Sequence, residues 1–463
     1  MKTPSLKSTE SRAGNRRELA VQDAATMLVV AAWHALTWLL VSCGIGLLLG
    51  ILLLFPSLNH WLGEWTYGHW MPVHMNLNLY GWCSLPLVAW LFKVYQVDRP
   101  PASPWIRPAL WAWSTALAVG AWSWLNGHSS GKLFLDWQGY PLVLLGVAML
   151  FLWCLLTWSF YRHSRSRESG SWLSWMAKMA GLVSLLLVPF TLYWAAGQKV
   201  YPPVNPDTGG PTGASLLEST LGIVFVLLVV PYGAAGKMQA KQRMIAVAWA
   251  LFMAENLWCL ALGRGNYSHR QPSEFLSLGS LLLWVPVIPA YFRAFSWPNG
   301  TQRWRDALFF WWGLLVVTAW LMFLPGPLDR FKFTDALVGH SHLAMAGFIS
   351  SLNLFLLVAL LGKDGRGLNS DWAFYAWQAG TLGYVFVMFL AGCLESNDPA
   401  FTIVPGAARD TLYSLRLVCG FLMLASAFHW WRKISQAVSD RRIIEAKAVS
   451  TSPGQRLLGG KLA

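Results

Sequence analysis

The chain alternates between long uncharged apolar runs and short polar segments, and this pattern predicts helices that cross a membrane. The apolar runs reach about 20 residues, the length that an α-helix needs to cross the hydrocarbon core of a bilayer. We expect about twelve such spans, near residues 27–55, 72–96, 106–126, 139–161, 174–196, 214–236, 243–263, 275–295, 306–324, 337–361, 372–394 and 411–432. The predicted fold class is therefore all-α, a polytopic membrane bundle.

Polar segments flank this predicted membrane domain. The sequence divides into an N-terminal tail at 1–26, a membrane domain at 27–432 and a C-terminal tail at 433–463. The composition of both tails predicts disorder. The first 25 residues are polar and the first apolar run has full membrane length, so this run is predicted to be an anchor helix and not a cleavable signal peptide.

Composition and charge agree with a membrane protein. The chain is 55% hydrophobic and 12% charged, with a mean hydropathy of +0.43. A net charge of +14 could suggest nucleic acid, but the basic residues gather in the tails and in the loops of one side. The positive-inside rule makes that side cytoplasmic. We therefore expect both termini in the cytoplasm, the lipid bilayer as partner and no nucleic acid.

Three histidines lie at one depth of the predicted bundle. His74 lies just inside the outer end of the second span, and His340 and His342 lie just inside the outer end of the tenth. An imidazole surrounded by hydrocarbon needs a polar partner, a water-lined cavity or a metal. Three at one level favour a shared site over three unrelated buried histidines.

The spacing of His340 and His342 limits the metal that they could bind. Residues two apart on an α-helix are separated by roughly 200°, so these imidazoles leave opposite sides of the helix and cannot close on one zinc ion. Haem iron takes an axial imidazole perpendicular to the macrocycle, so this helix could ligate one haem on each side. His74 could then supply the second axial ligand of one haem, and the other haem would keep an open position.

At these residues the chain resembles subunit I of the haem-copper oxidase superfamily, and within it the cbb-type cytochrome oxidases and nitric oxide reductases. The resemblance covers nearly the whole membrane domain. It rests on Pro72-Val-His74 with Tyr80-Gly81-Trp82, on Phe333-Thr-Asp-Ala-Leu-Val-Gly-His-Ser-His342, and on Leu415-Arg-Leu-Val-Cys-Gly420 with Trp430-Trp-Arg432.

The resemblance implies a twelve-helix bundle with two haems, which we expect to be of b type. His74 and His342 would be the axial ligands of a low-spin haem, and His340 the axial ligand of a high-spin haem. It also implies a multi-pass protein of a bacterial-type inner (plasma) membrane, working with other respiratory subunits. A c-type cytochrome or a quinol would supply the electrons.

One part of the family pattern is missing. The family builds its copper or non-haem iron site from one histidine in helix six and two adjacent histidines in helix seven, and neither predicted helix has a histidine here. Alignment on a shared glycine places Glu218 at the helix-six histidine. Alignment of Trp249-Ala-Leu-Phe places Glu255 near the family's tyrosine. His269, just past helix seven, is an alternative displaced ligand.

Glu218 and Glu255 have two interpretations. A carboxylate inside a span is costly and usually functional, and carboxylates suit iron(II) better than copper(I), so the pair could hold a second, non-haem metal or relay protons. Alternatively, each carboxyl group is neutral and hydrogen-bonds a neighbouring helix, through Asn256 or Ser219. The sequence leaves both interpretations open.

Arg409 and Arg416, near the outer end of the twelfth span, are candidate partners of haem propionates, because arginine makes bidentate contacts with carboxylates. The alternative is a structural salt bridge to Asp410 or Glu395.

Taken with the resemblance, these residues predict a haem-binding respiratory oxidoreductase that passes electrons from a low-spin to a high-spin haem and reduces oxygen or nitric oxide. The missing copper-site histidines favour an alternative, a degenerate copper-free subunit that carries electrons or has a structural role in a membrane complex. A transporter with histidines along its pathway is a third interpretation, and it would bind no haem.

Overall fold

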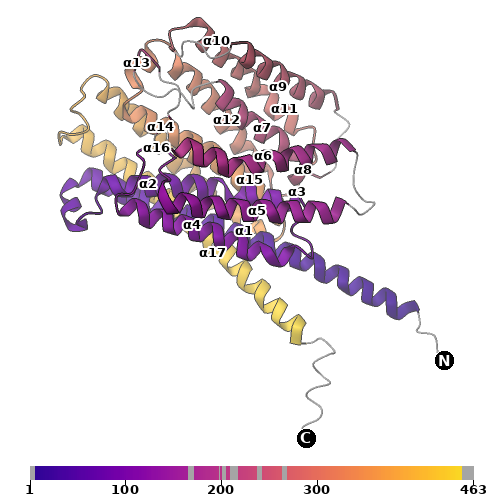
Figure 1. Ribbon diagram of the computed structural model, residues 1–463. Helices are drawn as coiled ribbons and strands as arrows, with labels where there is room; N and C mark the ends of the chain where they lie inside the picture. The colour runs from indigo at the N-terminus through magenta and orange to yellow at the C-terminus, as the bar shows by residue number, and fades with distance from the viewer. Residues whose placement is uncertain are drawn as a thin grey trace.

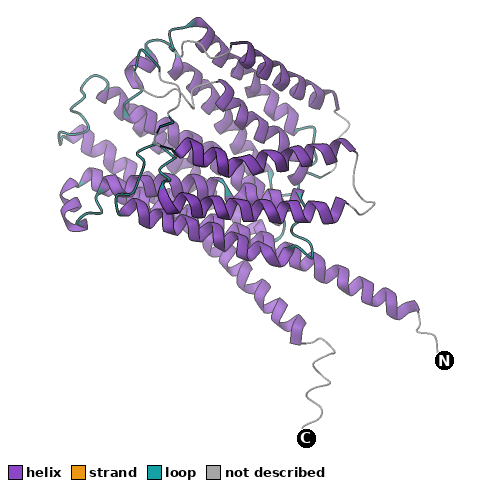
Figure 2. Ribbon diagram, viewed as in Figure 1, coloured by secondary structure: helices purple, strands orange, loops and turns teal. Residues whose placement is uncertain are grey.

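The computed structural model describes residues 6–164, 172–197, 199–200, 205–208, 217–236, 242–262 and 268–450. Within these ranges the chain consists of helices and loops and contains no strand (Figure 2). The helices, which pack side by side in one bundle (Figure 1), are α1 (Leu6–Leu54), η1 (Pro56–Leu62), α2 (Tyr67–Asn76), η2 (Leu77–Cys83), α3 (Leu85–Val94), η3 (Ser103–Trp105), α4 (Ile106–Leu125), α5 (Gly139–Ser164), α6 (Trp172–Ala196), α7 (Leu217–Val229), α8 (Pro231–Ala234), α9 (Gln242–Leu262), α10 (Pro272–Gly279), η5 (Ser280–Leu283), α11 (Trp284–Phe292), α12 (Gln302–Phe323), α13 (Pro327–Phe331), α14 (Asp335–His342), η6 (Leu343–Ile349), α15 (Ser350–Leu361), η7 (Asp364–Asn369), α16 (Asp371–Glu395) and α17 (Ala407–Ser450). The predicted all-α fold class is confirmed.

Nine helical stretches in the described part of the chain are long and apolar enough to cross a membrane. They are Ala25–Leu54, Gly139–Ser164, Trp172–Ala196, Arg243–Leu262, Pro272–Phe292, Gln302–Phe323, Asp335–Leu361, Asp371–Glu395 and Ala407–Arg441. Each coincides with one predicted span. The chain is therefore a polytopic membrane protein, as predicted.

The other three predicted spans are also helical, but two of them are interrupted. The second consists of α2, η2 and α3, and Pro86 occupies the second position of α3. The sixth consists of α7 and α8, and Pro231 opens α8. A proline lacks the backbone N–H, so it suits the first turn of a helix and not its interior. The count of twelve membrane crossings stays a prediction.

The first and last helices extend past the bundle. α1 begins at Leu6 and α17 ends at Ser450, and both project from the same end of the bundle (Figure 1), which we call the terminal side. The prediction of disorder is therefore wrong for residues 6–26 and 433–450. These segments contain no proline and are rich in good helix formers, and extending an existing helix requires no new nucleation. The cytoplasmic location of this side stays a prediction.

The helix that carries His340 and His342 lies at the centre of the bundle. Asp335–Leu361, which comprises α14, η6 and α15, is the most buried of the nine candidate spans, with 67% of its apolar window buried. α12 packs against η6 and α15, and α16 packs along α14. α1 and α17 pack against each other, and α2 and η2 lie against α1. The predicted site is thus enclosed on several sides by helices that are distant in sequence.

Candidate metal centre

A capped helix start positions His340 and His342. Thr334 precedes α14, and its Oγ1 accepts a hydrogen bond from the backbone N–H of Ala336 at 3.3 Å. Asp335 supplies a carboxylate in the first turn, where the helix dipole favours negative charge. An ideal Cβ on Gly392 of α16 would lie 2.3 Å from the backbone nitrogen of Ala336, so only glycine permits this approach. The first turn of α14 is therefore fixed against α16.

The structure brings His74 and His342 together. Their ring centroids are 6.4 Å apart and their planes differ by 19°. A metal bound between two imidazole nitrogens at about 2.0–2.1 Å from each, with roughly 1 Å more to each ring centre, would separate the centroids by about 6 Å. The observed separation therefore matches the distance between two axial ligands of one iron.

In both rings Nδ1 is hydrogen-bonded to a backbone carbonyl. His74 Nδ1 lies 2.8 Å from the carbonyl oxygen of Ser42 on α1, and His342 Nδ1 lies 2.9 Å from that of Val338. A carbonyl oxygen can only accept, so each Nδ1 carries the hydrogen and each Nε2 keeps its lone pair. Metal-binding histidines are usually oriented in this way, by donation of the second ring N–H to a carbonyl or a carboxylate.

A glycine borders the His74 ring. An ideal Cβ on Gly46 of α1 would lie 2.7 Å from Cε1 of His74, so a glycine is needed beside this ring. The side chains of His74 and His342 are both partly buried. These observations fit a haem held between His74 and His342.

His340 points to a different helix. Its ring lies next to the backbone of Leu315 on α12, whereas the His342 ring stacks on Tyr384 of α16, with a centroid distance of 4.2 Å. The two imidazoles thus face different neighbours, as their spacing predicts. His340 Nε2 is buried and has no hydrogen-bond partner among the described residues. A buried nitrogen without a partner is costly and fits a ligand to a second iron.

A short π-helix follows each histidine segment. η2 starts at Leu77, three residues after His74, and η6 starts at Leu343, directly after His342. π-helical turns are rare and occur frequently at functional sites. The two are linked to each other, because Trp82 Nε1 in η2 donates to Ser350 Oγ at 2.9 Å, just past η6. The histidine helices are therefore joined by their irregular turns.

Arg416 places a buried positive charge beside the pair of rings. It is 9% exposed and interacts electrostatically with both His74 and His342. Its Cζ lies 5.3 Å from the ring centre of Tyr384 and 5.7 Å from that of Tyr413, and Tyr413 Oη donates to Asp335 Oδ2 at 3.0 Å. Arg416 thus lies where an anionic group next to His342 would be neutralised.

Arg409 is held by other groups. Its Nη1 binds Asp410 Oδ1 at 2.7 Å, its Nη2 donates to the carbonyl of Leu53 at 2.7 Å, and its Nε donates to the carbonyl of Thr402 at 3.0 Å. The salt bridge to Asp410 that the sequence offered as an alternative is therefore present. A role of Arg409 toward a propionate stays a prediction.

Glu255 is buried against a neighbouring helix. Its Oε2 accepts a hydrogen bond from Trp284 Nε1 of α11 at 2.5 Å, and its Oε1 is buried without a partner among the described residues. The helix-to-helix bond expected in the second interpretation is present, although its partner is Trp284 and not Asn256. Glu218 lies in α7, but its side chain is outside the described residues, as is that of Ser219.

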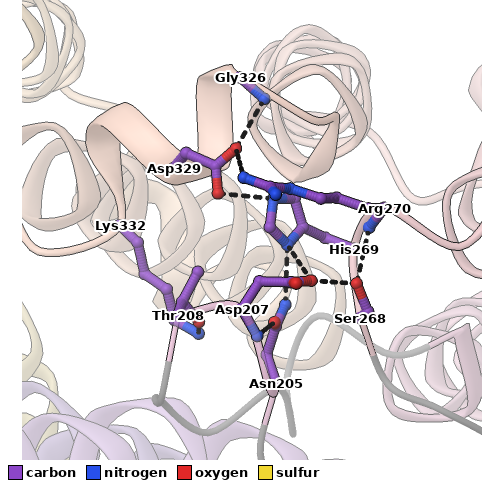
Figure 3. A network of polar contacts seen from close by, with 9 residues as sticks. All are labelled: Asn205, Asp207, Thr208, Ser268, His269, Arg270, Gly326, Asp329 and Lys332. Carbon is purple, nitrogen blue, oxygen red and sulfur yellow. Dashed lines mark hydrogen bonds and ion pairs between the residues drawn. The ribbon is translucent and has the colours of Figure 1, made fainter.

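His269 belongs to a cluster of polar residues around α13 (Figure 3). Its Nε2 lies 2.9 Å from Asp329 Oδ1, and its Nδ1 lies 3.0 Å from Asn205 Nδ2. Asn205 Oδ1 accepts the N–H of Asp207 at 2.9 Å, so Nδ2 must donate to His269 Nδ1. Because Nδ1 accepts this bond, Nε2 carries the ring hydrogen and faces the Asp329 carboxylate, so neither nitrogen offers a free lone pair to a metal.

The same cluster carries further charged groups around Asp329. Arg270 Nη2 lies 3.2 Å from its carboxylate, and Lys332 Nζ donates to Thr208 Oγ1 at 2.6 Å (Figure 3). Partial burial acts to raise the pKa of Asp329, but hydrogen bonds from the Gly326 N–H, His269 and Arg270 outweigh it and lower the pKa. Burial lowers the pKa of Lys332. The cluster is thus an ionic link between residues 205–208, 268–270 and 326–332.

Across the described residues, no group of three or more histidine, cysteine, aspartate or glutamate side chains lies close enough to hold a metal ion. The pairing of His74 with His342 brings together two candidate ligands, fewer than such a group contains.

Sequence reasoning missed Tyr384 and the Ser42 carbonyl. A signal for Tyr384 was available, because Gly380, Tyr384, Met388 and Gly392 recur every four residues and share the buried face of α16. The Ser42 carbonyl belongs to the backbone, and only the packing of α1 against α2 shows its role.

Comparison with known proteins shows a distant likeness to an oxidase subunit. The chain is 22% identical to cytochrome c oxidase subunit 1 of Rhodobacter capsulatus over 455 aligned positions, which cover 86% of this chain and 83% of the relative. No protein-family model matches the chain. The likeness extends over most of both sequences and supports a haem-copper-oxidase-like membrane protein.

Proposed function

We propose that this chain is the haem-carrying membrane subunit of a respiratory oxidoreductase that reduces oxygen or nitric oxide. The pairing of His74 with His342 supports the proposal most directly. Their centroid distance of 6.4 Å suits one iron, and both Nε2 atoms keep a lone pair because both Nδ1 atoms donate to carbonyls. Likeness to a cytochrome c oxidase subunit 1 and a multi-pass membrane architecture agree with it.

The three histidines would have two tasks. His74 and His342 would hold a low-spin haem, which six-coordinate iron with two imidazoles produces. His340, on the other side of α14, would hold a high-spin haem by a single bond. When bound, the haems would supply one-electron redox chemistry. The protein orients the rings of His74 and His342 through the carbonyls of Ser42 and Val338.

Arg416 would stabilise the site electrostatically. It is buried close to both rings, and a guanidinium group binds carboxylates in a bidentate way. In this proposal Arg416 neutralises a haem propionate and Arg409 supports the same region. By the family resemblance, a c-type cytochrome or a quinol would supply the electrons, and other respiratory subunits would surround the chain in a bacterial-type inner membrane.

The second candidate function is a copper-free subunit that carries electrons or has a structural role. Two observations favour it. The helices that hold the second metal in the resembling family have no histidine here, and Glu255 is engaged by Trp284. If Glu218 and Glu255 instead hold a hard ion or relay protons, their removal must stop turnover while both haems stay bound.

An optical spectrum of the purified, dithionite-reduced protein with and without carbon monoxide tests these proposals. A shift of part of the haem absorbance indicates an open iron at His340 and supports gas reduction. Haem without a shift supports the electron carrier, and a protein without haem refutes both. In parallel, His74→Ala and His342→Ala should each remove the low-spin spectrum and spare some high-spin haem, whereas His340→Ala should do the reverse.

A further inference from the structure

The His342 imidazole has an aromatic ring against one of its faces. Its centroid lies 4.2 Å from that of Tyr384 on α16, and the two planes differ by 29°. Tyr384 is 6% exposed, so its ring belongs to the interior of the bundle. The hydrogen bond from His342 Nδ1 to the Val338 carbonyl, at 2.9 Å, holds one atom of the imidazole. Such a bond weakens steeply only below about 120°, so by itself it tolerates a substantial turn of the ring.

The short centroid distance limits that turn. Aromatic rings that meet edge to face need more space than stacked rings, because one edge points into the partner's face. In this chain His34 and Trp111 meet in this way at 4.9 Å and 83°, and Trp372 and His429 at 4.8 Å and 75°. At 4.2 Å the imidazole cannot stand on edge against Tyr384, so it must lie nearly flat on that ring.

Tyr384 is kept in place because α16 lies tightly against α14. An ideal Cβ on Gly339 of α14 would lie 3.0 Å from the Cβ of Met388 and 3.3 Å from the Val385 carbonyl oxygen. An ideal Cβ on Gly392 of α16 would lie 2.3 Å from a backbone nitrogen of α14. In a close-packed interior, helices that approach this closely leave no gap into which a ring could retreat.

The same segment of α16 is also in close contact with α17. An ideal Cβ on Gly380 would lie 2.8 Å from the Cys419 carbonyl oxygen, and one on Gly383 would lie 2.9 Å from Cys419 Sγ. Arg416, one turn before Cys419, has its Cζ 5.3 Å from the ring centre of Tyr384. Tyr384 therefore lies in a part of α16 that two neighbouring helices hold.

We propose that Tyr384 is a positioning residue that fixes the plane of the His342 imidazole. It would thereby maintain the angle of 19° between the rings of His342 and His74. His74 is held by other means, because its Nδ1 binds the Ser42 carbonyl and its ring lies beside Gly46. This inference rests on the proposed function, since it takes the two rings as axial ligands of one low-spin haem. Tyr384 itself would make no bond to iron.

The plane of an axial imidazole has a measurable consequence. Groups around a metal ligand set its orientation and thereby tune the metal. The ring plane determines which iron d orbital the imidazole π system overlaps. Near-parallel rings act on the same orbital and give a rhombic electron paramagnetic resonance signal, whereas rings turned toward the perpendicular give a strongly anisotropic one. The spectrum therefore reports the ring angle separately from haem binding.

Three variants separate the flat face of Tyr384 from its hydroxyl group and from general packing. Tyr384→Leu removes the flat face, and Tyr384→Phe keeps it but removes the hydroxyl group. Phe389→Leu is the matched control, because Phe389 lies on the same helix and meets α14 at Gly339, 3.3 Å from its ideal Cβ. The oxidised, purified proteins would be compared by electron paramagnetic resonance, and haem per mole of protein measured from reduced-minus-oxidised spectra. Gel filtration checks folding.

We expect wild type, Tyr384→Phe and Phe389→Leu to share one rhombic signal. Tyr384→Leu should bind as much low-spin haem, because the two ligand nitrogens are unchanged, but its highest g value should shift upward as the His342 ring turns. An unchanged signal in Tyr384→Leu, or the same shift in Tyr384→Phe or Phe389→Leu, would overturn the proposal.

A second variant covers the case in which Tyr384→Leu loses haem or does not fold. Tyr384→Met also lacks a flat face, and its flexible side chain fills irregular gaps, so it should show the same shift. Loss of haem from both variants would mean that Tyr384 has a purely structural role and would overturn the proposal. A wild-type protein without low-spin haem would refute the proposed function itself, a result distinct from an unshifted signal in a protein that binds haem.

Discussion

Gly46 gives the sharpest test of the position of His74. An alanine there would place its Cβ 2.7 Å from His74 Cε1 and 3.1 Å from Nδ1, whereas ordinary contact begins at 3.4 Å. The ring must therefore move by about 0.7 Å, enough to lengthen the 2.8 Å bond from Nδ1 to the Ser42 carbonyl beyond hydrogen-bonding range. Loss of such an orienting bond typically weakens metal binding 10–100-fold, or by about 1.4–2.8 kcal/mol.

Gly44 supplies the matched control, because an added Cβ there meets nothing within 4 Å. In a helix interior alanine is intrinsically favoured over glycine by about 1 kcal/mol, so Gly44→Ala should fold at least as well as wild type. Gly46→Ala should lose low-spin haem absorbance per mole of protein, measured by reduced-minus-oxidised spectra during haem titration. If both variants bind haem as wild type does, His74 is not an axial ligand held against Gly46, and the reasoning fails.

Three further predictions concern geometry, charge and hydrogen bonding. The near-parallel rings of His74 and His342, at 19°, should give the oxidised low-spin haem a rhombic electron paramagnetic resonance signal; a highly anisotropic signal would mean that the rings are not coplanar ligands. The lowered pKa of Asp329 means that its stabilisation is present above its ordinary pKa of 3.8 and disappears as pH falls through the lower folded value. Asp329→Asn should therefore flatten the acid limb of a plot of melting temperature against pH, and an unchanged limb would contradict the ionic link. Glu255→Leu removes the acceptor for the buried Trp284 N–H and should lower the unfolding free energy by about 1–3 kcal/mol, whereas Glu255→Gln keeps an acceptor and should retain most of the wild-type stability. Equal losses of stability in the two variants would argue against this bond. Loss of turnover in Glu255→Gln would support a catalytic carboxyl group.

The sequence predicted the helices well because a bilayer imposes a simple requirement. Every backbone polar group must be paired within the segment, so an uncharged run of sufficient length is helical. The location of the histidines followed from the same reasoning, because His74, His340 and His342 were counted from the ends of apolar runs. The 200° separation of His340 from His342 needs only helix geometry, and the structure shows their rings facing different helices.

The features that sequence reasoning missed depend on packing between helices. The Ser42 carbonyl is invisible in a sequence, because every residue has a carbonyl. The partner of Glu255 was expected among Asn256 and Ser219, but Trp284 lies on another helix and reaches it only in the folded bundle. The helical tails were missed because polar composition was taken for disorder, although long neighbouring helices can extend into such segments.

The two linked π-turns also divide each histidine helix into two parts. We call the part that carries the histidine the outer half and the part that follows the π-turn the inner half. A π-turn accommodates one residue more than an α-turn. A serine hydroxyl donates a hydrogen bond to a carbonyl of each π-turn five residues back: Ser84 Oγ to the Leu79 carbonyl and Ser350 Oγ to the Met345 carbonyl. Deletion of that extra residue would rotate the outer half by about 100° and turn the histidine away while the inner half kept its packing. The ligand-bearing face and the bundle-forming face of one span can therefore change independently through single-residue insertions, and a helical wheel drawn across the whole span would misplace one of them.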